Sequence, residues 1–119
     1  MKLIVAIVRP ERLEAVQERL AEAKVFRLTV SDVQGVSPAG AGSAAAAYAA
    51  GGGAGSASPP QRRVKLEVAV NEDFVEPAVR AIQAAAQSSG GEAGDGAVFV
   101  LPLEEAIRIR TGERGPDAI

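Results

Sequence analysis

The segment Arg63-Val64-Lys65-Leu66-Glu67-Val68-Ala69-Val70 is the most regular stretch of the chain. Apolar residues stand at the even positions, and charged or small residues stand at the odd ones. This period of two is typical of a β-strand, in which successive side chains point to opposite faces. The segment therefore predicts a strand with a continuous apolar face.

Three elements are expected before this strand. Residues 3–8 form a short apolar run rich in β-branched residues, which is typical of a central strand buried on both faces, and Pro10 closes it. Residues 11–24 carry apolar residues at three- and four-residue spacing, which predicts an amphipathic helix. Residues 26–35 alternate again and predict a second strand with one solvated face.

A second helix is expected after the strand. Asp73 and Glu76 have the spacing of a capping box, Pro77 is tolerable only near the first turn, and an apolar stripe runs to Ala86. Three elements complete the pattern: a glycine-rich turn over 88–96, a fourth strand over 98–101 and a short fifth strand over 106–110. The order of elements predicts an α+β, ferredoxin-like double βαβ fold with an antiparallel sheet. A chain of 119 residues fits one domain, 1–119, with 111–119 as its C-terminal segment.

Residues 37–61 differ in kind from the rest. They are rich in Ser, Pro, Ala and Gly, and contain one aromatic residue, Tyr48, and no charged residue. Such a stretch cannot pack a core, so it predicts a long flexible loop between the second and third strands. Two interpretations stay open: a tolerated low-complexity insertion, or a functional loop that contacts a partner.

Composition excludes several classes of function. The net charge of -2 offers no electrostatic basis for binding nucleic acid or an anionic membrane. The chain has no cysteine and no histidine, which removes disulfides, thiolate metal sites and the usual imidazole bases. No apolar run is long enough to span a bilayer, and the beginning of the chain does not resemble a signal peptide. We therefore expect a cytoplasmic protein without membrane insertion and without a metal site.

Two features suggest an anion site. If 106–110 is a strand, Arg108 and Arg110 lie on one side of it, roughly 7 Å apart, which suits two oxygens of an oligophosphate. The plainer alternative is that both arginines are solvated or paired with Glu104 or Glu105. The second feature is Gly94-Asp95-Gly96, a turn whose backbone can approach a phosphate closely, although many hairpins carry such a turn.

The chain resembles the PII family of signalling proteins over nearly its whole length. The resemblance rests on the opening residues 1–10, on Thr29-Val30 with 33–35, on 64–67, on the Gly94 turn with 99–102, and on 107–113 with 117–119. Only 37–61 lacks it. The resemblance implies a homotrimer that binds ADP, AMP or ATP in clefts between subunits, without a resident cofactor. It also implies that 37–61 contacts a protein target, which we leave unidentified.

The resemblance assigns roles to particular residues. Thr29, Glu67 and the backbone around Gly35 would hold the adenosine. The turn Gly94-Asp95-Gly96 and Arg63 would meet the phosphates. Arg108 and Arg110 would reach in from the neighbouring subunit.

The chain also departs from the family pattern. Pro38-Ala39 replaces the family's Arg-Gln, and Ala97 replaces a lysine, so groups that hold the outer phosphates and 2-oxoglutarate are missing. We therefore expect ADP or AMP to bind at least as tightly as ATP. Tyr48 lacks the charged surroundings of the family's modified tyrosine. The departures resemble PII-like paralogues of inorganic-carbon uptake and carboxysomes, which bind adenine nucleotides with bicarbonate.

Three functions are weighed on this basis. The favoured one is a regulator, not an enzyme, that senses adenine nucleotides, with bicarbonate as an optional second effector. The first alternative is a nitrogen-regulatory PII protein that responds to ATP and 2-oxoglutarate. The second is an acylphosphatase-like enzyme whose chemistry would rest on Asp95, Glu67 or a water on Asn71. A metal-tolerance trimer of similar shape would require histidine or cysteine ligands.

Overall fold

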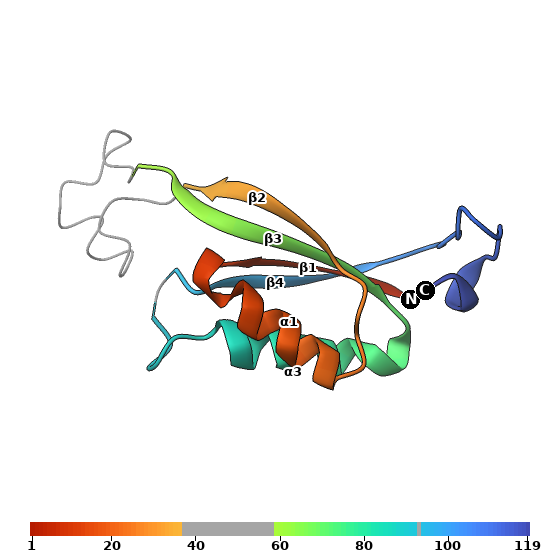
Figure 1. Ribbon diagram of the computed structural model, residues 1–119, viewed down its shortest axis with the longest axis horizontal. Helices are drawn as coiled ribbons and strands as arrows, with labels where there is room; N and C mark the ends of the chain where they lie inside the picture. Colours follow the sequence, from red (N-terminus) through yellow and green to blue (C-terminus); the bar gives the residue numbers. More distant parts are fainter. Residues whose placement is uncertain (37–58, 93) are drawn as a thin grey trace.

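The computed structural model describes residues 1–36, 59–92 and 94–119. Figure 1 shows a single sheet with two helices packed against it. The elements, in chain order, are β1 (Lys2–Val8), a 3-10 turn η1 (Pro10–Arg12), α1 (Leu13–Glu22), β2 (Thr29–Gly35), β3 (Gln61–Val70), α3 (Glu72–Ala86), β4 (Gly96–Pro102) and a 3-10 turn η2 (Gly115–Ala118).

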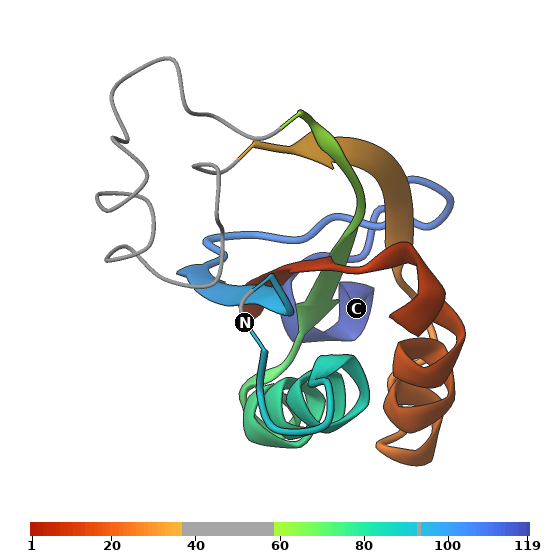
Figure 2. The same ribbon diagram turned by 90° about the vertical axis from the view of Figure 1, so that its left-hand side faces the viewer.

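The sheet has four strands in the order β2-β3-β1-β4, and each neighbouring pair is antiparallel. Helices α1 and α3 lie side by side beneath one face, as the end-on view in Figure 2 shows. This arrangement confirms the predicted antiparallel α+β fold with ferredoxin-like order. The flexible loop expected over 37–61 falls largely outside the described residues, as do Pro38-Ala39 and Tyr48, and the described part resumes at Pro59 and enters β3 at Gln61.

The core lies between the sheet and the two helices. All four apolar residues at the even positions of β3 are buried, which confirms the alternation predicted for 63–70. In β1 only Ile4, Ala6 and Val8 are buried, so the expectation that this strand is buried on both faces is wrong for the single chain. The physical reason is that both helices cover the same face of the sheet.

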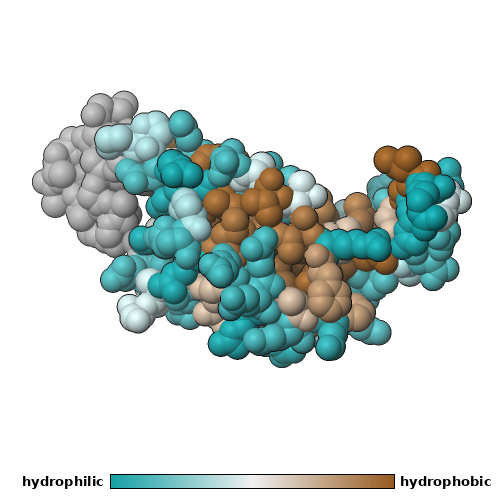
Figure 3. Space-filling model, in the orientation of Figure 1, coloured by the Kyte–Doolittle hydropathy of each residue, from teal (hydrophilic) through white to brown (hydrophobic). Residues whose placement is uncertain are grey.

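The opposite face of the sheet is open. Phe99 pairs with Val5 and Leu101 pairs with Leu3, and these pairs point away from the helices. The side chain of Phe99 is 53% exposed and that of Leu101 is 42% exposed. Figure 3 views another side of the molecule, with α1 toward the viewer as in Figure 1, and shows hydrophobic side chains in the middle of that side and a further hydrophobic spot on the C-terminal segment.

Three local predictions need correction. Residues 106–110 form no strand: one bridge pairs Ile107 with Arg114, and the Arg108 amide donates to the Glu113 carbonyl at 2.9 Å. Positive φ angles at Gly112 and Gly115 bend this segment into a tight hairpin, whose Ile109 is fully exposed.

The second and third corrections concern element ends. Helix α3 begins at Glu72, with Asn71 at its N-cap and no side-chain capping bond, so the capping box of Asp73 and Glu76 does not form. Pro77 consequently lies at the sixth helical residue, just beyond the first turn. Strand β2 begins at Thr29 rather than near Phe26.

Candidate anion-binding site

The Gly94 turn lies at the end of the sheet where β4 begins, and two arginines converge on it. A Cβ atom placed on Gly94 would lie 3.2 Å from Nη2 of Arg9 and 3.6 Å from Nη2 of Arg63. Arg9 follows β1 directly, and Arg63 lies near the start of β3. Gly94 has a φ of 91°, a conformation that glycine adopts without strain.

The charges of this cluster do not cancel. Nε of Arg9 lies 3.6 Å from Oδ1 of Asp95, which offsets one positive charge. Among the described residues no carboxylate forms an ion pair with Arg63, whose Nη1 donates to the Arg62 carbonyl at 2.7 Å. A net positive charge beside an exposed glycine turn favours an anion.

Asp95 faces into the loop that precedes β4. Its Oδ2 accepts a hydrogen bond from the Ser88 backbone amide at 2.9 Å and another from the Ser88 hydroxyl at 3.0 Å. These bonds, the backbone one first, and the nearby Arg9 hold the pKa of the Asp95 carboxyl below its ordinary value. The carboxylate therefore stays charged at neutral pH and is already engaged within the chain.

Neighbouring atoms lie so close to Gly96 and Gly35 that a larger residue would meet them at either position. A Cβ on Gly96 would lie 1.8 Å from the Ile7 carbonyl oxygen, and the residue has a φ of 111°. A Cβ on Gly35 would lie 3.3 Å from Cγ of Arg63. Gly35 thus lies beside the cationic cluster, at the opposite end of β2 from Thr29.

Thr29 and Glu67 form a second group. They are register partners in β2 and β3, and both line a cavity of about 430 Å³ together with Leu28 and Ala106. Nζ of Lys65 lies 3.6 Å from Oε1 of Glu67. Glu67 lies four residue steps after Arg63 in β3, which amounts to roughly 13 Å along the strand.

Arg108 and Arg110 lie at the other end of the molecule. Figure 1 shows the C-terminal segment and the 88–96 loop at opposite ends of the sheet. Arg108 donates to Oε1 of Glu113 at 3.2 Å and to the Asp117 carbonyl at 3.1 Å. Because 106–110 is not a strand, strand geometry no longer places the two arginines on one side. The alternative that Arg108 pairs with Glu104 or Glu105 is not realised either, because Arg108 pairs with Glu113 and Arg114 pairs with Glu105.

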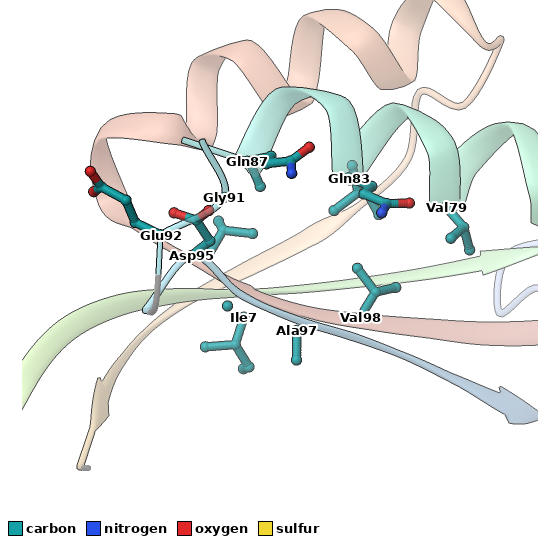
Figure 4. A pocket seen from close by; sticks show the side chains of 13 residues that line it. Ile7, Val79, Gln83, Gln87, Gly91, Glu92, Asp95, Ala97 and Val98 are labelled. Carbon is teal, nitrogen blue, oxygen red and sulfur yellow. The ribbon is translucent and has the colours of Figure 1, made fainter. Parts of the chain in front are cut away.

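A cavity of about 500 Å³ lies beside the loop, between α3 and the edge of the sheet at β4. Figure 4 shows Gln83 of α3, Gln87 directly after α3 and Asp95 of the loop on one side of β4, with Ile7 and Ala97 on the other. The cavity shares Asp95 and Gly96 with the Gly94 turn. A ligand anchored at the turn therefore has adjoining space whose walls are partly apolar and partly polar.

Arg9 is the member of the cluster that sequence reasoning missed. It stands directly before Pro10, and the residue pair reads as the end of a strand. The position of Arg9 at the end of an apolar run could have indicated a role in the site, because charged residues at strand ends often line sites at the edge of a sheet. Within the described ranges, no group of three acidic residues is suited to hold a metal ion.

Comparison with known proteins identifies the family of this chain. A model of the family "Nitrogen regulatory protein P-II" matches residues 1–113. The chain belongs to the P-II family. Nitrogen regulatory protein GlnK1 of Methanosarcina mazei is 45% identical over 119 residues, which cover all of this chain and 97% of the relative. Nitrogen regulatory protein P-II of Rhodospirillum rubrum is 42% identical over 119 residues, with full coverage of both chains.

A solved P-II structure shows the same fold. The crystal structure of Arabidopsis thaliana PII bound to citrate matches with a TM-score of 0.75 and 36% identity. The match covers 99% of this chain and 91% of that one. These comparisons confirm the resemblance and identify the chain as a P-II-family nitrogen regulatory protein. No helix in the described part of the chain is long and apolar enough to cross a membrane.

Proposed function

We propose that this P-II-family protein is a regulator that binds an adenine nucleotide in a cleft shared by two subunits of a homotrimer. The observation that carries the proposal is the convergence of Arg9 and Arg63 on Gly94, beside the engaged carboxylate of Asp95. This cluster offers a preformed seat for phosphates. It needs no catalytic base.

The shared cleft follows from where the other candidate residues lie. Thr29 and Glu67 line a separate cavity with Ala106, and Arg108 and Arg110 lie at the far end of the sheet. One chain cannot bring both the Gly94 cluster and these other residues to one nucleotide. A neighbouring chain can instead present its own copies of those residues to the Gly94 turn of the first chain. The exposed apolar residues of the open face, Phe99 and Leu101 among them, support burial against other copies of the chain.

Nitrogen regulation is the setting that the relatives favour. The similar proteins named above are described as nitrogen regulatory proteins, and none of these descriptions refers to inorganic carbon. Bicarbonate as a second effector stays a prediction. The nucleotide preference also stays a prediction: Ala97 lies next to Gly96 and offers no charge to an outer phosphate, so ADP or AMP should bind at least as tightly as ATP.

The three groups that an enzyme of this fold would use are occupied and lie apart. Asp95 accepts two bonds from Ser88, Glu67 pairs with Lys65, and Nδ2 of Asn71 donates to the Pro116 carbonyl at 3.2 Å. They form no common site. This arrangement supports a regulator over an acylphosphatase-like enzyme.

A complementation experiment tests the shared cleft. Arg63→Ala and Arg108→Ala should each weaken ADP binding by about 1.5 to 3 kcal/mol, roughly ten- to a hundredfold. When the two variants are unfolded and refolded together, mixed trimers should regain tight sites, because some clefts then combine an intact Arg63 with an intact Arg108 from the next chain. Each variant refolded alone is the control.

Titration calorimetry with ADP, AMP and ATP, with and without magnesium, 2-oxoglutarate and bicarbonate, measures the result. Mixtures that bind no better than the separate variants would place the whole site in one chain and contradict the proposal. A clear ATP preference strengthened by 2-oxoglutarate would replace the expected nucleotide preference.

A further inference from the structure

The loop between α3 and β4 is closed by one side chain, that of Ser88. Its hydroxyl donates to Oδ2 of Asp95 at 3.0 Å and accepts from the Glu92 amide at 2.9 Å. Its amide donates to the same carboxylate oxygen, and its carbonyl accepts from the Gly91 amide at 3.0 Å. All four hydrogen bonds connect Ser88 to later residues of the loop.

Little else holds this loop in place. None of its described residues is buried, and Gly90, Gly91 and Gly94 have positive φ angles that a free chain would leave readily. The loop therefore owes its conformation to polar contacts rather than to packing. At its far end, Gly96 is fixed by its pairing with Val8 in the sheet.

The carboxylate of Asp95 would oppose an anion unless its charge were directed elsewhere. Oδ2 is taken by Ser88, Oδ1 faces Arg9 at 3.6 Å, and the side chain is only 17% exposed. The two contacts engage both carboxylate oxygens within the chain. They also tie the loop to the end of β1, where Arg9 approaches Gly94.

We propose that Ser88 and Asp95 form a latch that positions the Gly94 turn against Arg9 and Arg63 for binding of a phosphate group. Ser88 and Asp95 are positioning residues and do not themselves hold the anion. The proposal rests on the proposed function for its ligand, an adenine nucleotide. Its structural part, the closing of the loop by Ser88, can be tested without any ligand.

The experiment compares wild type, Ser88→Ala, Ser88→Thr and Ser89→Ala. Ser88→Ala removes the hydroxyl that connects Asp95 and Glu92, Ser88→Thr keeps it, and Ser89→Ala removes a hydroxyl from the exposed neighbour. Hydrogen exchange of the loop amides reports on the latch itself. Affinities for ADP and for adenosine, measured by calorimetry and competition, separate phosphate binding from nucleoside binding.

We expect Ser88→Ala to speed exchange at residues 90–96 and to weaken ADP about tenfold, with adenosine affinity unchanged. Ser88→Thr should restore both readouts, and Ser89→Ala should match wild type. Unchanged exchange in Ser88→Ala would overturn the latch. Equal loss of ADP and adenosine would reduce Ser88 to a general structural role. If wild type binds no ADP, the proposed function fails, and exchange alone decides whether the latch exists.

Discussion

The two ends of the sheet hold their arginines in different ways. At the end with the Gly94 turn, two arginines approach a backbone that glycine leaves bare, and one carboxylate is held by Ser88 within the loop. At the other end, Arg108 is bound by Glu113 and by the Asp117 carbonyl of its own hairpin. The first end is built to receive an anion, and the second to hold an arginine in a fixed position. This difference is what the proposed shared cleft requires, in which each end supplies half of a site.

The largest expected effect tests how rigid the first end is. Gly96→Ala would place a Cβ against the Ile7 carbonyl oxygen, so β4 must shift, and we expect the free energy of unfolding to fall by about 3 kcal/mol or more. Gly90→Ala is the matched control, because Gly90 also has a positive φ but has open space around it. It should cost about 1 kcal/mol. Equal losses in urea unfolding would mean that φ strain, and not the contact with Ile7, fixes Gly96.

The next effect tests whether ADP affinity depends on the position of an arginine beside Gly94 or only on its charge. Arg63→Ala and Arg62→Ala remove the same charge from neighbouring positions, but only Arg63 approaches Gly94. Arg63→Ala should weaken ADP by about 1.5 to 3 kcal/mol, and Arg62→Ala by less than about 0.5 kcal/mol. Calorimetry at two salt concentrations measures both. Similar losses in the two variants would reduce the site to a general electrostatic attraction.

The sequence predicted some of these features and not others. The alternation of 63–70 predicted β3 and its buried face, because a period of two leaves one arrangement of side chains. The same reasoning failed at Ile107-Arg108-Ile109-Arg110, because Gly112 and a bond between Arg108 and Glu113 bend the segment into a hairpin. The types of residue in the site were readable from their chemistry. Arg9 was not, since its approach to Gly94 depends on the packing of β1 against β4.

A gain of function would sharpen the comparison. Ala97→Lys adds a cation directly after Gly96, on the same side of β4 as Ile7. We expect the affinity for ATP to rise about three- to tenfold relative to ADP, because the added charge can reach an outer phosphate. Ala97→Gln is the control for added length without charge. An ATP affinity that rises equally in both variants would attribute the gain to contact area.

The smallest effect concerns acid. Because the pKa of Asp95 is lowered in the folded chain, its contacts stabilise the fold fully above the ordinary value of 3.8, and this contribution is lost as the pH falls through the lowered pKa. The difference in stability between wild type and Asp95→Asn should therefore be constant from about pH 7 to pH 5 and shrink below about pH 4. Glu72, whose pKa is also lowered by its bond to the amino terminus of Met1, contributes equally to both proteins and cancels. Chemical unfolding at several pH values measures this difference in stability. A difference that grows as the pH falls would contradict the expected direction.

The open face of the sheet links folding to protein concentration. Phe99 and Leu101 stay in contact with water in a single chain, so the core between sheet and helices accounts for only part of the apolar surface that the sequence can bury. If other copies of the chain cover that face, as proposed above, folding is coupled to association by mass action, and dilution favours unfolding. Melting temperature should rise with concentration. The amount of this protein in a cell would thus also set how long each molecule stays folded.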